Sequence, residues 1–257
     1  MAAIRPLEDI VAEAKRLVAV AAEHDAVARL LGGTAFVIAA GDHLPASRRA
    51  SIQDIDLATR KRDASRLEAI LTDNGYEPNA TFNAINGATR RIYYDTAHHR
   101  HIDVFVDHFE MCHVIPIAKT LTASRITLPL TELLLTKLQI VELNEKDAQD
   151  VLYLCSAYPV ADGDEPGTIG LGRIRPLVGS DWGWWRTITL NLDRITALAS
   201  GDGQGLVPAG GKHDPVKQLA VLSQAIEATP KTLRWKARAR VGERVRWYEQ
   251  PEETPHH

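Results

Sequence analysis

The sequence is poor in cysteine. Cys112 and Cys155 are its two cysteines, and they form no Cys-x-x-Cys spacing. Two cysteines are too few for the disulfide framework on which many small secreted domains depend. A reducing compartment is therefore the expected environment of the chain.

A long hydrophobic run is also lacking. None of the apolar stretches reaches the roughly 20 residues that a membrane-spanning helix needs. The first residues do not resemble a signal peptide, because Glu8 and Glu13 interrupt them and their apolar residues have helical spacing. We expect a cytoplasmic protein that does not bind a membrane.

No strong excess of either charge is present. The formal net charge is −3 and the sequence pI is about 6.4. This balance does not indicate a protein that is basic throughout, as many nucleic-acid-binding proteins are, but it allows a local basic patch. With 257 residues, 45% of them hydrophobic and 25% charged, the chain can form one large domain or two small ones.

The first half of the sequence alternates between helix and strand patterns. Apolar residues with helical spacing give way to short runs rich in β-branched residues. Thr34 is the expected N-cap of a short helix, and polar residues 42–50 predict a loop. The order α-β-α-β-α-β-β indicates an α/β or α+β fold with a small mixed sheet flanked by helices. The expected strands lie within residues 27–33, 51–59, 89–95 and 100–107, and the expected helices within 7–26, 35–41 and 64–75.

After Pro129 the pattern becomes helical. Loops rich in Gly, Asp and Pro separate the helical segments at residues 160–172 and 201–215. We therefore expect an N-terminal domain of residues 1–127 and a mostly helical C-terminal domain of residues 128–257. The expected helices of the second domain lie within residues 130–143, 145–158, 181–200 and 216–229.

Two aspartates stand one residue apart in the strand predicted within residues 51–59. Because side chains alternate along a strand, Asp54 and Asp56 point to the same face. Two carboxylates that close resist ionising together unless a cation neutralises them. Mg²⁺ favours this arrangement, because it binds one or two carboxylates together with substrate phosphates. The alternative is the exposed end of an edge strand with two solvated acids.

Two further features support a metal and phosphate site. Gly32 and Gly33 precede a short helix, whose N-terminus presents backbone N–H groups to an anion. Asp103 lies in the most strand-like run of the chain, where it can add a third carboxylate. Asp107 shares its predicted face but lies nearer the strand end. Alone, the Gly-Gly pair also fits an ordinary turn between a strand and a helix.

The order of these motifs along the chain resembles that of the polymerase-β-like nucleotidyltransferase superfamily: Gly-Gly-Thr before a short helix, then Asp-Ile-Asp on a strand, then an aspartate on a later strand. The resemblance implies transfer of a nucleoside monophosphate from an NTP to an acceptor hydroxyl, with Asp103 placed to help deprotonate the acceptor. One departure is the longer stretch between Gly33 and Asp54, which an insertion at residues 41–51 explains. The resemblance implies that Gly32, Gly33 and Thr34 hold the triphosphate, and that Asp54, Asp56 and Asp103 bind Mg²⁺ or Mn²⁺.

Residues 136–154, "TKLQIVELNEKDAQDVLYL", are similar to a signature of the abortive-infection-type nucleotidyltransferase toxins of toxin–antitoxin systems. That branch adds nucleotides to RNA acceptors such as the 3′ end of tRNA. The similarity implies that Lys137 and Asp147 are a functional pair, with Asp150 beside them, and that Lys137 contacts the nucleotide. It also implies a cognate antitoxin as a partner.

Simpler structural interpretations of this pair remain open. Lys137 falls inside an apolar helical stripe, where its stem can lie along the stripe with its amine in water. Asn144 can cap a new helix, and Asp147 then stands in the first turn, where an acid is favoured.

Other candidates are weaker. The His98–His101 run, "HHRH", has the residue type for zinc but not the spacing, and polar lining near Asp103 is the preferred interpretation. Ser51 can bind a phosphate or end the loop before Asp54. Cys112 and His113 are adjacent, which does not make a catalytic dyad. The run "DWGWWR" at residues 181–186 predicts a packed aromatic helix rather than a surface that stacks on a base.

Residues 231–246 carry seven basic residues and one acid. They form a solvated helix surface or a contact for the phosphate backbone of an RNA acceptor. The expected function is thus a metal-dependent nucleotidyltransferase with an RNA acceptor. A small-molecule acceptor, as in aminoglycoside-modifying relatives, and a catalytically inactive protein that binds nucleotide or RNA are the alternatives.

Overall fold

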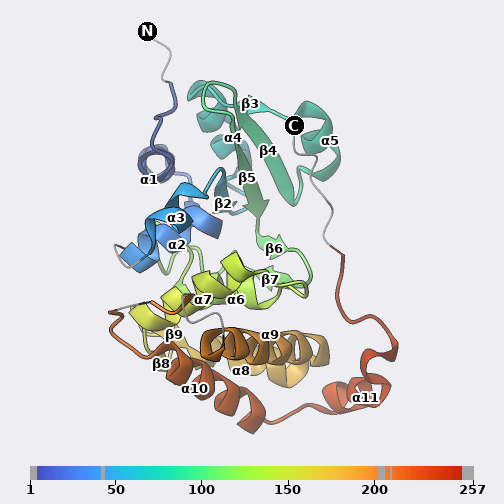
Figure 1. The fold of residues 1–257 in the computed structure, drawn as a ribbon. Coiled ribbons are helices and arrows are strands. Elements are labelled where there is room, and N and C mark those ends of the chain that lie inside the picture. The colour runs from blue at the N-terminus through green and yellow to red at the C-terminus, as the bar shows by residue number, and fades with distance from the viewer. Residues whose placement is uncertain (1–4, 42–43, 202–205, 209, 251–257) are drawn as a thin grey trace. The chain divides into compact units, whose positions relative to one another are not determined.

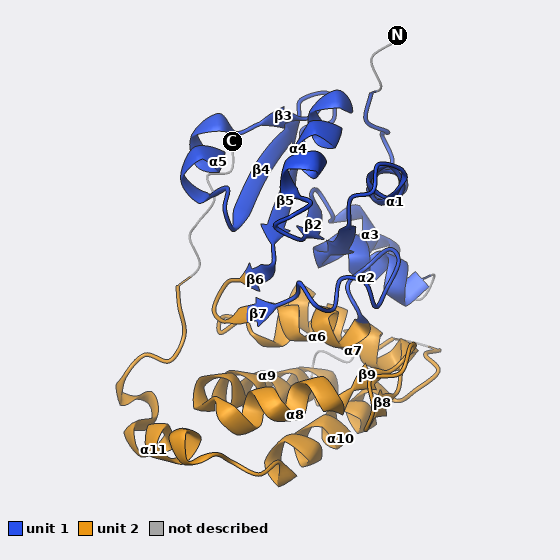
Figure 2. Ribbon diagram, turned by 180° about the vertical axis from the view of Figure 1, so that it is seen from behind, with its two compact units in different colours: residues 1–109, 115–129 blue, residues 110–114, 130–257 orange. Residues whose placement is uncertain are grey.

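The computed structural model describes residues 5–41, 44–201, 206–208 and 210–250. These residues form a mixed α/β structure with a mixed five-stranded sheet (Figure 1), so the expected fold class is confirmed at this level. The chain divides into two compact units (Figure 2). Unit 1 comprises residues 1–109 and 115–129, and unit 2 comprises residues 110–114 and 130–257.

Unit 1 contains the five-stranded sheet and the helices that cover it. The strands of this sheet are β1 Ala28–Leu31, β2 Ile55–Thr59, β3 Glu77–Pro78, β4 Arg90–Asp95 and β5 Arg100–Val106. The helices of unit 1 are α1 Ile10–Glu23, α2 Gly32–Ala40, α3 Ala46–Ala50, α4 Ala64–Asp73 and α5 Ala80–Asn86. The short strands β6 His108–Glu110 and β7 Val114–Pro116 pair with each other.

The strand order of the sheet is β1-β2-β5-β4-β3. β2 and β5 at its centre run parallel, in a register that pairs Ile55 with Ile102 and Thr59 with Val106. The β1–β2, β4–β5 and β3–β4 pairs are antiparallel. Parallel neighbours need a long crossover connection, and here α4, β3, α5 and β4 supply it.

Two adjacent arginines on β4 identify the two faces of the sheet. Arg91 donates to the Ala64 carbonyl and to Glu68, which both belong to α4. Arg90, one residue earlier and so on the opposite face, bonds to Asp103 of β5. The side chain of Asp103 therefore lies on the face that α4 does not cover.

A buried acidic side chain connects α1 to Tyr76, the residue before β3. Asp9 caps α1 by accepting from the Ala12 N–H, and Glu13 in the first turn is fully buried. Glu13 accepts hydrogen bonds from Tyr76 Oη at 2.7 Å and from Arg16. Burial would raise the pKa of Glu13, but these hydrogen bonds outweigh it and hold that pKa below its ordinary value.

The predicted helices and strands of unit 1 are confirmed, with three differences. Thr34 is not an N-cap: α2 begins at Gly32, and Thr34 is buried in its first turn. Part of the predicted loop at 42–50 is helical, as α3, whereas residues 42–43 lie outside the described residues. The prediction missed the short strands β3, β6 and β7 and the helix α5, which begins after the cap residue Asn79.

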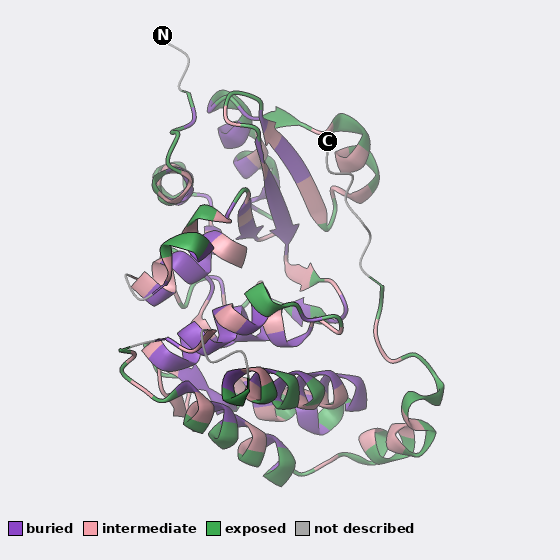
Figure 3. Ribbon diagram, in the orientation of Figure 1, coloured by how far each residue is buried: buried purple, intermediate pink, exposed green. Residues whose placement is uncertain are grey.

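Unit 2 is mostly helical. Buried residues are concentrated on α6 and α7, whereas α11 has none (Figure 3). Its helices are α6 Leu130–Leu138, α7 Glu145–Ala157, α8 Leu171–Ser180, α9 Trp182–Ser200, α10 Pro215–Ala228 and α11 Leu233–Val241, and its short strands are β8 Val160–Ala161 and β9 Ile169–Gly170.

Local signals explain most of these boundaries. The predicted break at Asn144 is confirmed, because the Asn144 side chain accepts from the Asp147 N–H at the start of α7. The sequence prediction missed α8, which contains Pro176 in its interior and starts in the predicted loop. In the part of the chain that the structure describes, no helix combines the length and apolar character needed to cross a membrane.

Candidate active site

The three aspartates singled out in the sequence come together in unit 1. Asp56 of β2 pairs in register with Asp103 of β5, and Asp54 immediately precedes β2. Residues paired in a parallel ladder point to the same face, and Asp54 shares the face of Asp56 by alternation. All three carboxylates therefore belong to the face of the sheet that α4 leaves uncovered.

The Gly-Gly turn lies directly beside this face. Leu31 at the end of β1 pairs with Asp56, so Gly32 begins α2 next to the Asp56 carboxylate. Gly32 has a φ of +61°, and a side chain there would overlap Oδ2 of Asp56. Glycine is needed here both for its backbone conformation and for this close approach.

The N-terminus of α2 has polar groups that no side chain of the first turn caps. Its N-cap residue, Leu31, makes no side-chain hydrogen bond to the first turn. The hydroxyl of Thr34 is buried, and it has no hydrogen-bond partner among the described residues. Buried polar groups are normally satisfied, so this hydroxyl and the helix N-terminus together suit a bound anion.

Arg90 neutralises Asp103 in this structure. Its Nε lies 2.9 Å from each carboxylate oxygen, and Nη2 makes a further contact with Oδ2. The guanidinium also lies 5.2 Å from the ring centre of Phe105 and 5.8 Å from that of Phe82. Burial raises the pKa of Asp103, whereas the Arg90 guanidinium opposes the rise.

Asp54 is the accessible member of the three. Its side chain is 42% exposed, compared with 6% for that of Asp103. His101, which shares the face of Asp103 on β5, places Nε2 at 3.7 Å from Asp54 Oδ2. The site thus has an open end at Asp54 and His101 and a closed end at Asp103 and Arg90.

These positions fit a divalent cation in part. Among the described residues, no group of three or more His, Cys, Asp or Glu side chains is arranged to hold a metal ion. Asp54 and Asp56 nevertheless match the one or two carboxylates that Mg²⁺ takes together with substrate phosphates. Asp103 can join them only when Arg90 releases it, so its role as a third ligand stays a prediction.

Ser51 is engaged within its own loop. Its hydroxyl donates to the Arg48 carbonyl at 2.8 Å and lies 3.0 Å from a guanidinium nitrogen of the same arginine. The structure therefore gives Ser51 a local role at the end of α3, and phosphate binding by this residue stays a prediction.

Lys137 belongs to unit 2, where it forms a buried ion cluster. Its Nζ lies 2.7 Å from Asp147 Oδ1 and 3.0 Å from Asp150 Oδ2. Burial would lower the pKa of Lys137, but the two carboxylates outweigh it and raise that pKa above its ordinary value. The interpretation of Lys137 as a stem with its amine in water is wrong, because the side chain is 13% exposed and its amine is ion-paired.

The histidine run does not converge on one point. His98 pairs with the buried Asp95 at 2.8 Å, and His101 lies beside Asp54. Arg100, between them in sequence, bonds to Asp95 and to the carbonyls of Leu7 and Glu8. His98 and Arg100 therefore have a structural role, whereas His101 belongs to the candidate site.

Cys112 and His113 form no dyad. His113 Nε2 lies 2.8 Å from Thr187 Oγ1, and the imidazole stacks on Trp184 with ring centres 4.7 Å apart. Burial lowers the pKa of His113 to about 4, so this histidine is neutral at physiological pH.

Sequence reasoning missed Arg90. It included His101 only as part of the His98–His101 run, interpreted as polar lining near Asp103, and the structure places His101 beside Asp54. Arg90 depends on the antiparallel register of β4, which pairs Ile92 with Asp103 and brings Arg90 diagonally beside it. That register depends on contacts between strands and cannot be obtained from residue spacing.

No family model, curated protein or solved structure matches the chain. Its function must be inferred from the chemistry of its own residues.

The close approach of Gly32 to Asp56 generates a first prediction. Gly32→Ala and Gly41→Ala both place a side chain at a φ of +61°, but no described atom lies within 4 Å of the added methyl group at Gly41. We expect Gly41→Ala to lower the free energy of unfolding by about 1 kcal/mol. Gly32→Ala should cost clearly more, because it must also displace the Asp56 carboxylate. Urea unfolding measures both values, and equal losses would contradict this packing.

The ion cluster of unit 2 generates a second prediction. Lys137→Met leaves Asp147 and Asp150 without their buried cation, so we expect the free energy of unfolding to fall by about 3–5 kcal/mol. Lys146→Met removes the same charge from an exposed position on α7, the helix that carries both aspartates, and should change the free energy of unfolding by less than about 0.5 kcal/mol. Urea unfolding at pH 7 compares the two variants. Equal effects would show that Lys137 is not the structural centre of this cluster.

Proposed function

We propose that this protein is a metal-dependent nucleotidyltransferase of the polymerase-β-like type. One observation carries the proposal: Asp56 and Asp103 are paired in register on adjacent parallel strands, and the Gly32 turn lies against Asp56. An ordinary surface turn has no need of paired acids beside a helix N-terminus. A site for a cation and a phosphate chain does need them.

Each residue has a definite task in this proposal. Asp54 and Asp56 would hold a divalent cation, Mg²⁺ or Mn²⁺, which supplies Lewis-acid stabilisation of charge on a phosphate. Backbone N–H groups at Gly32, Gly33 and Thr34 would bind and orient the triphosphate. Asp103, once free of Arg90, would accept the proton of the attacking hydroxyl.

The acceptor that we propose is RNA. Its support is the basic segment of residues 231–246 in unit 2, together with the resemblance of the sequence to toxin-type nucleotidyltransferases. The same resemblance supports an N-terminal nucleotidyltransferase domain, a helical C-terminal domain with Lys137 and Asp147 as a functional pair, and a cognate antitoxin. A small-molecule acceptor remains the rival for the same chemistry.

A specific observation favours a second function, that of a catalytically inactive protein that binds nucleotide or RNA. Both oxygens of Asp103 accept hydrogen bonds from Arg90, so the third carboxylate is neutralised within the protein itself. A permanent pair would leave Asp54 and Asp56 able to hold a cation but no free carboxylate to act as a base.

The proposal predicts which residues the transfer reaction needs. Purified protein is incubated with total RNA, Mg²⁺ and each α-labelled NTP in turn, and label in RNA is measured. We expect Asp56→Asn to reduce transfer at least about a thousandfold, because it removes a carboxylate that stabilises the transition state.

Asp73→Asn is the matched control, because it removes the same charge from an exposed position at the end of α4. It should transfer label at the rate of the wild-type protein. Transfer by the wild-type protein that survives Asp56→Asn would contradict the proposed site. If the wild-type protein binds NTP but never transfers label to RNA, the RNA acceptor is wrong, and the inactive alternative or the small-molecule rival replaces it.

A further inference from the structure

All five tryptophans of the chain belong to unit 2: Trp182, Trp184, Trp185, Trp235 and Trp247. Trp182 at the start of α9 contacts Trp247 edge to face, with ring centres 5.8 Å apart. Trp185, one helical turn later, contacts Trp235 of α11 at 5.2 Å. The aromatic residues thus join the start of α9 to the basic C-terminal segment.

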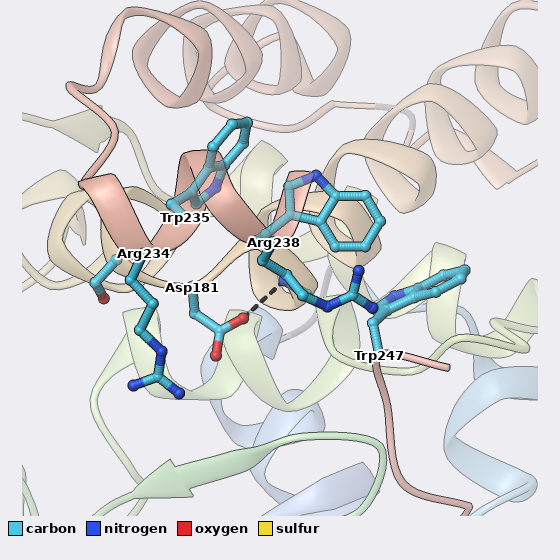
Figure 4. A pocket seen from close by; sticks show the side chains of 8 residues that line it. Asp181, Arg234, Trp235, Arg238 and Trp247 are labelled. Atoms are coloured by element: carbon cyan, nitrogen blue, oxygen red, sulfur yellow. Dashed lines mark hydrogen bonds between the residues drawn. The ribbon is translucent and has the colours of Figure 1, made fainter. Parts of the chain in front are cut away.

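A pocket of about 190 Å³ opens within this aromatic cluster. It lies where α11 meets the start of α9, and Asp181 and Arg234 extend toward the same side of α11 (Figure 4). Its walls combine indole rings, two guanidinium groups and one carboxylate. The pocket is lined by Ser180, Asp181, Trp182, Gly183, Arg234, Trp235, Arg238 and Trp247.

The pocket wall is held in place by specific contacts. Trp247 Nε1 donates to Thr187 Oγ1 at 3.0 Å, and a side chain at Gly183 would lie 2.8 Å from the Trp247 carbonyl oxygen. The Arg238 guanidinium lies 4.7 Å from the ring centre of Trp182 and donates to the carbonyls of Gly242 and Val245. Trp247 and Arg238 are therefore positioned before any ligand arrives.

The two other charged groups of the pocket, Asp181 and Arg234, differ in whether the protein itself already provides their hydrogen-bond partners. Asp181 Oδ1 accepts from the N–H groups of Gly183 and Trp184, as the N-cap of α9. Arg234 is exposed, and it has no hydrogen-bond or ion-pair partner within the described part of the chain. The pocket therefore presents a cation that is available to an anionic ligand, next to aromatic surface.

We propose that this pocket binds one nucleotide of single-stranded RNA. The base stacks on the indole surface at Trp247, and the adjoining phosphate pairs with Arg234. This proposal rests on the RNA acceptor of the proposed function and locates a binding site for it in unit 2.

Size and charge favour this ligand over its rivals. The pocket is smaller than the roughly 300–1,000 Å³ of typical small-molecule sites, so it suits a single base rather than a complete NTP. The bases of a double helix are stacked on each other and cannot enter it, whereas single strands offer unstacked bases. An acidic peptide would satisfy Arg234, but it would not need the aromatic wall.

The test measures binding of a fluorescein-labelled RNA decamer by anisotropy, without NTP or metal. Arg234→Gln should weaken binding about tenfold and reduce the slope of log K against log salt by about 0.7. Lys236→Gln removes an equally exposed charge of α11 that does not line the pocket. It should weaken binding by less than about threefold.

A second comparison tests the base. A decamer with abasic sugars keeps the phosphates, and we expect wild-type protein to bind it at least about fivefold more weakly than the intact decamer. Trp247→Leu should weaken binding of the intact decamer and leave binding of the abasic decamer unchanged. Near-ultraviolet circular dichroism of Trp247→Leu checks that the other tryptophans remain packed.

Three results would overturn the proposal: equal losses for Arg234→Gln and Lys236→Gln, equal affinity for the intact and abasic decamers, or tighter binding of a glutamate-rich decapeptide. Asp56→Asn should bind the decamer normally. Failure of nucleotide transfer with normal, pocket-dependent RNA binding would therefore refute the proposed function and not the pocket.

Discussion

The ion pair between Arg90 and Asp103 is the interaction on which the candidate site depends. Parallel pairing of β2 with β5 places Asp56 and Asp103 side by side, where two carboxylates repel each other unless a positive charge compensates them. Arg90 supplies that charge from β4. The sheet can therefore keep an acidic face that is partly buried, and the compensating charge comes from the chain itself.

The same constraint extends to the turn before α2. Asp56 has Asp103 on one side and the end of β1 on the other, so the backbone at Gly32 must pass the carboxylate without a side chain. The acidic face and the N-terminus of α2 are thus built by one set of contacts. In unit 2, the ion cluster at Lys137 repeats the principle, because one cation compensates two buried acids.

The sequence was informative wherever the relevant contact was local. Alternation along β2 predicted the shared face of Asp54 and Asp56, and Asn144 predicted the start of α7. The missed elements are short or contradict a local rule, as α8 does with Pro176 in its interior. Arg90 could not be predicted, because its contact with Asp103 depends on strand register. The pocket in unit 2 was missed because residues far apart in the sequence line it.

We propose that Asp54, Asp56 and Asp103 form a cation site, and that the Arg90 guanidinium bonded to Asp103 competes with the cation for it. Mn²⁺ binding, followed by electron paramagnetic resonance at pH 8, tests this claim directly in wild-type protein, Arg90→Gln and Arg91→Gln. The account predicts that Arg90→Gln binds Mn²⁺ about tenfold more tightly, because a competing positive charge is removed. Arg91→Gln, which removes an equal charge from the opposite face, should match the wild-type protein. Equal Mn²⁺ affinity in all three proteins, or no Mn²⁺ binding by any of them, would contradict it.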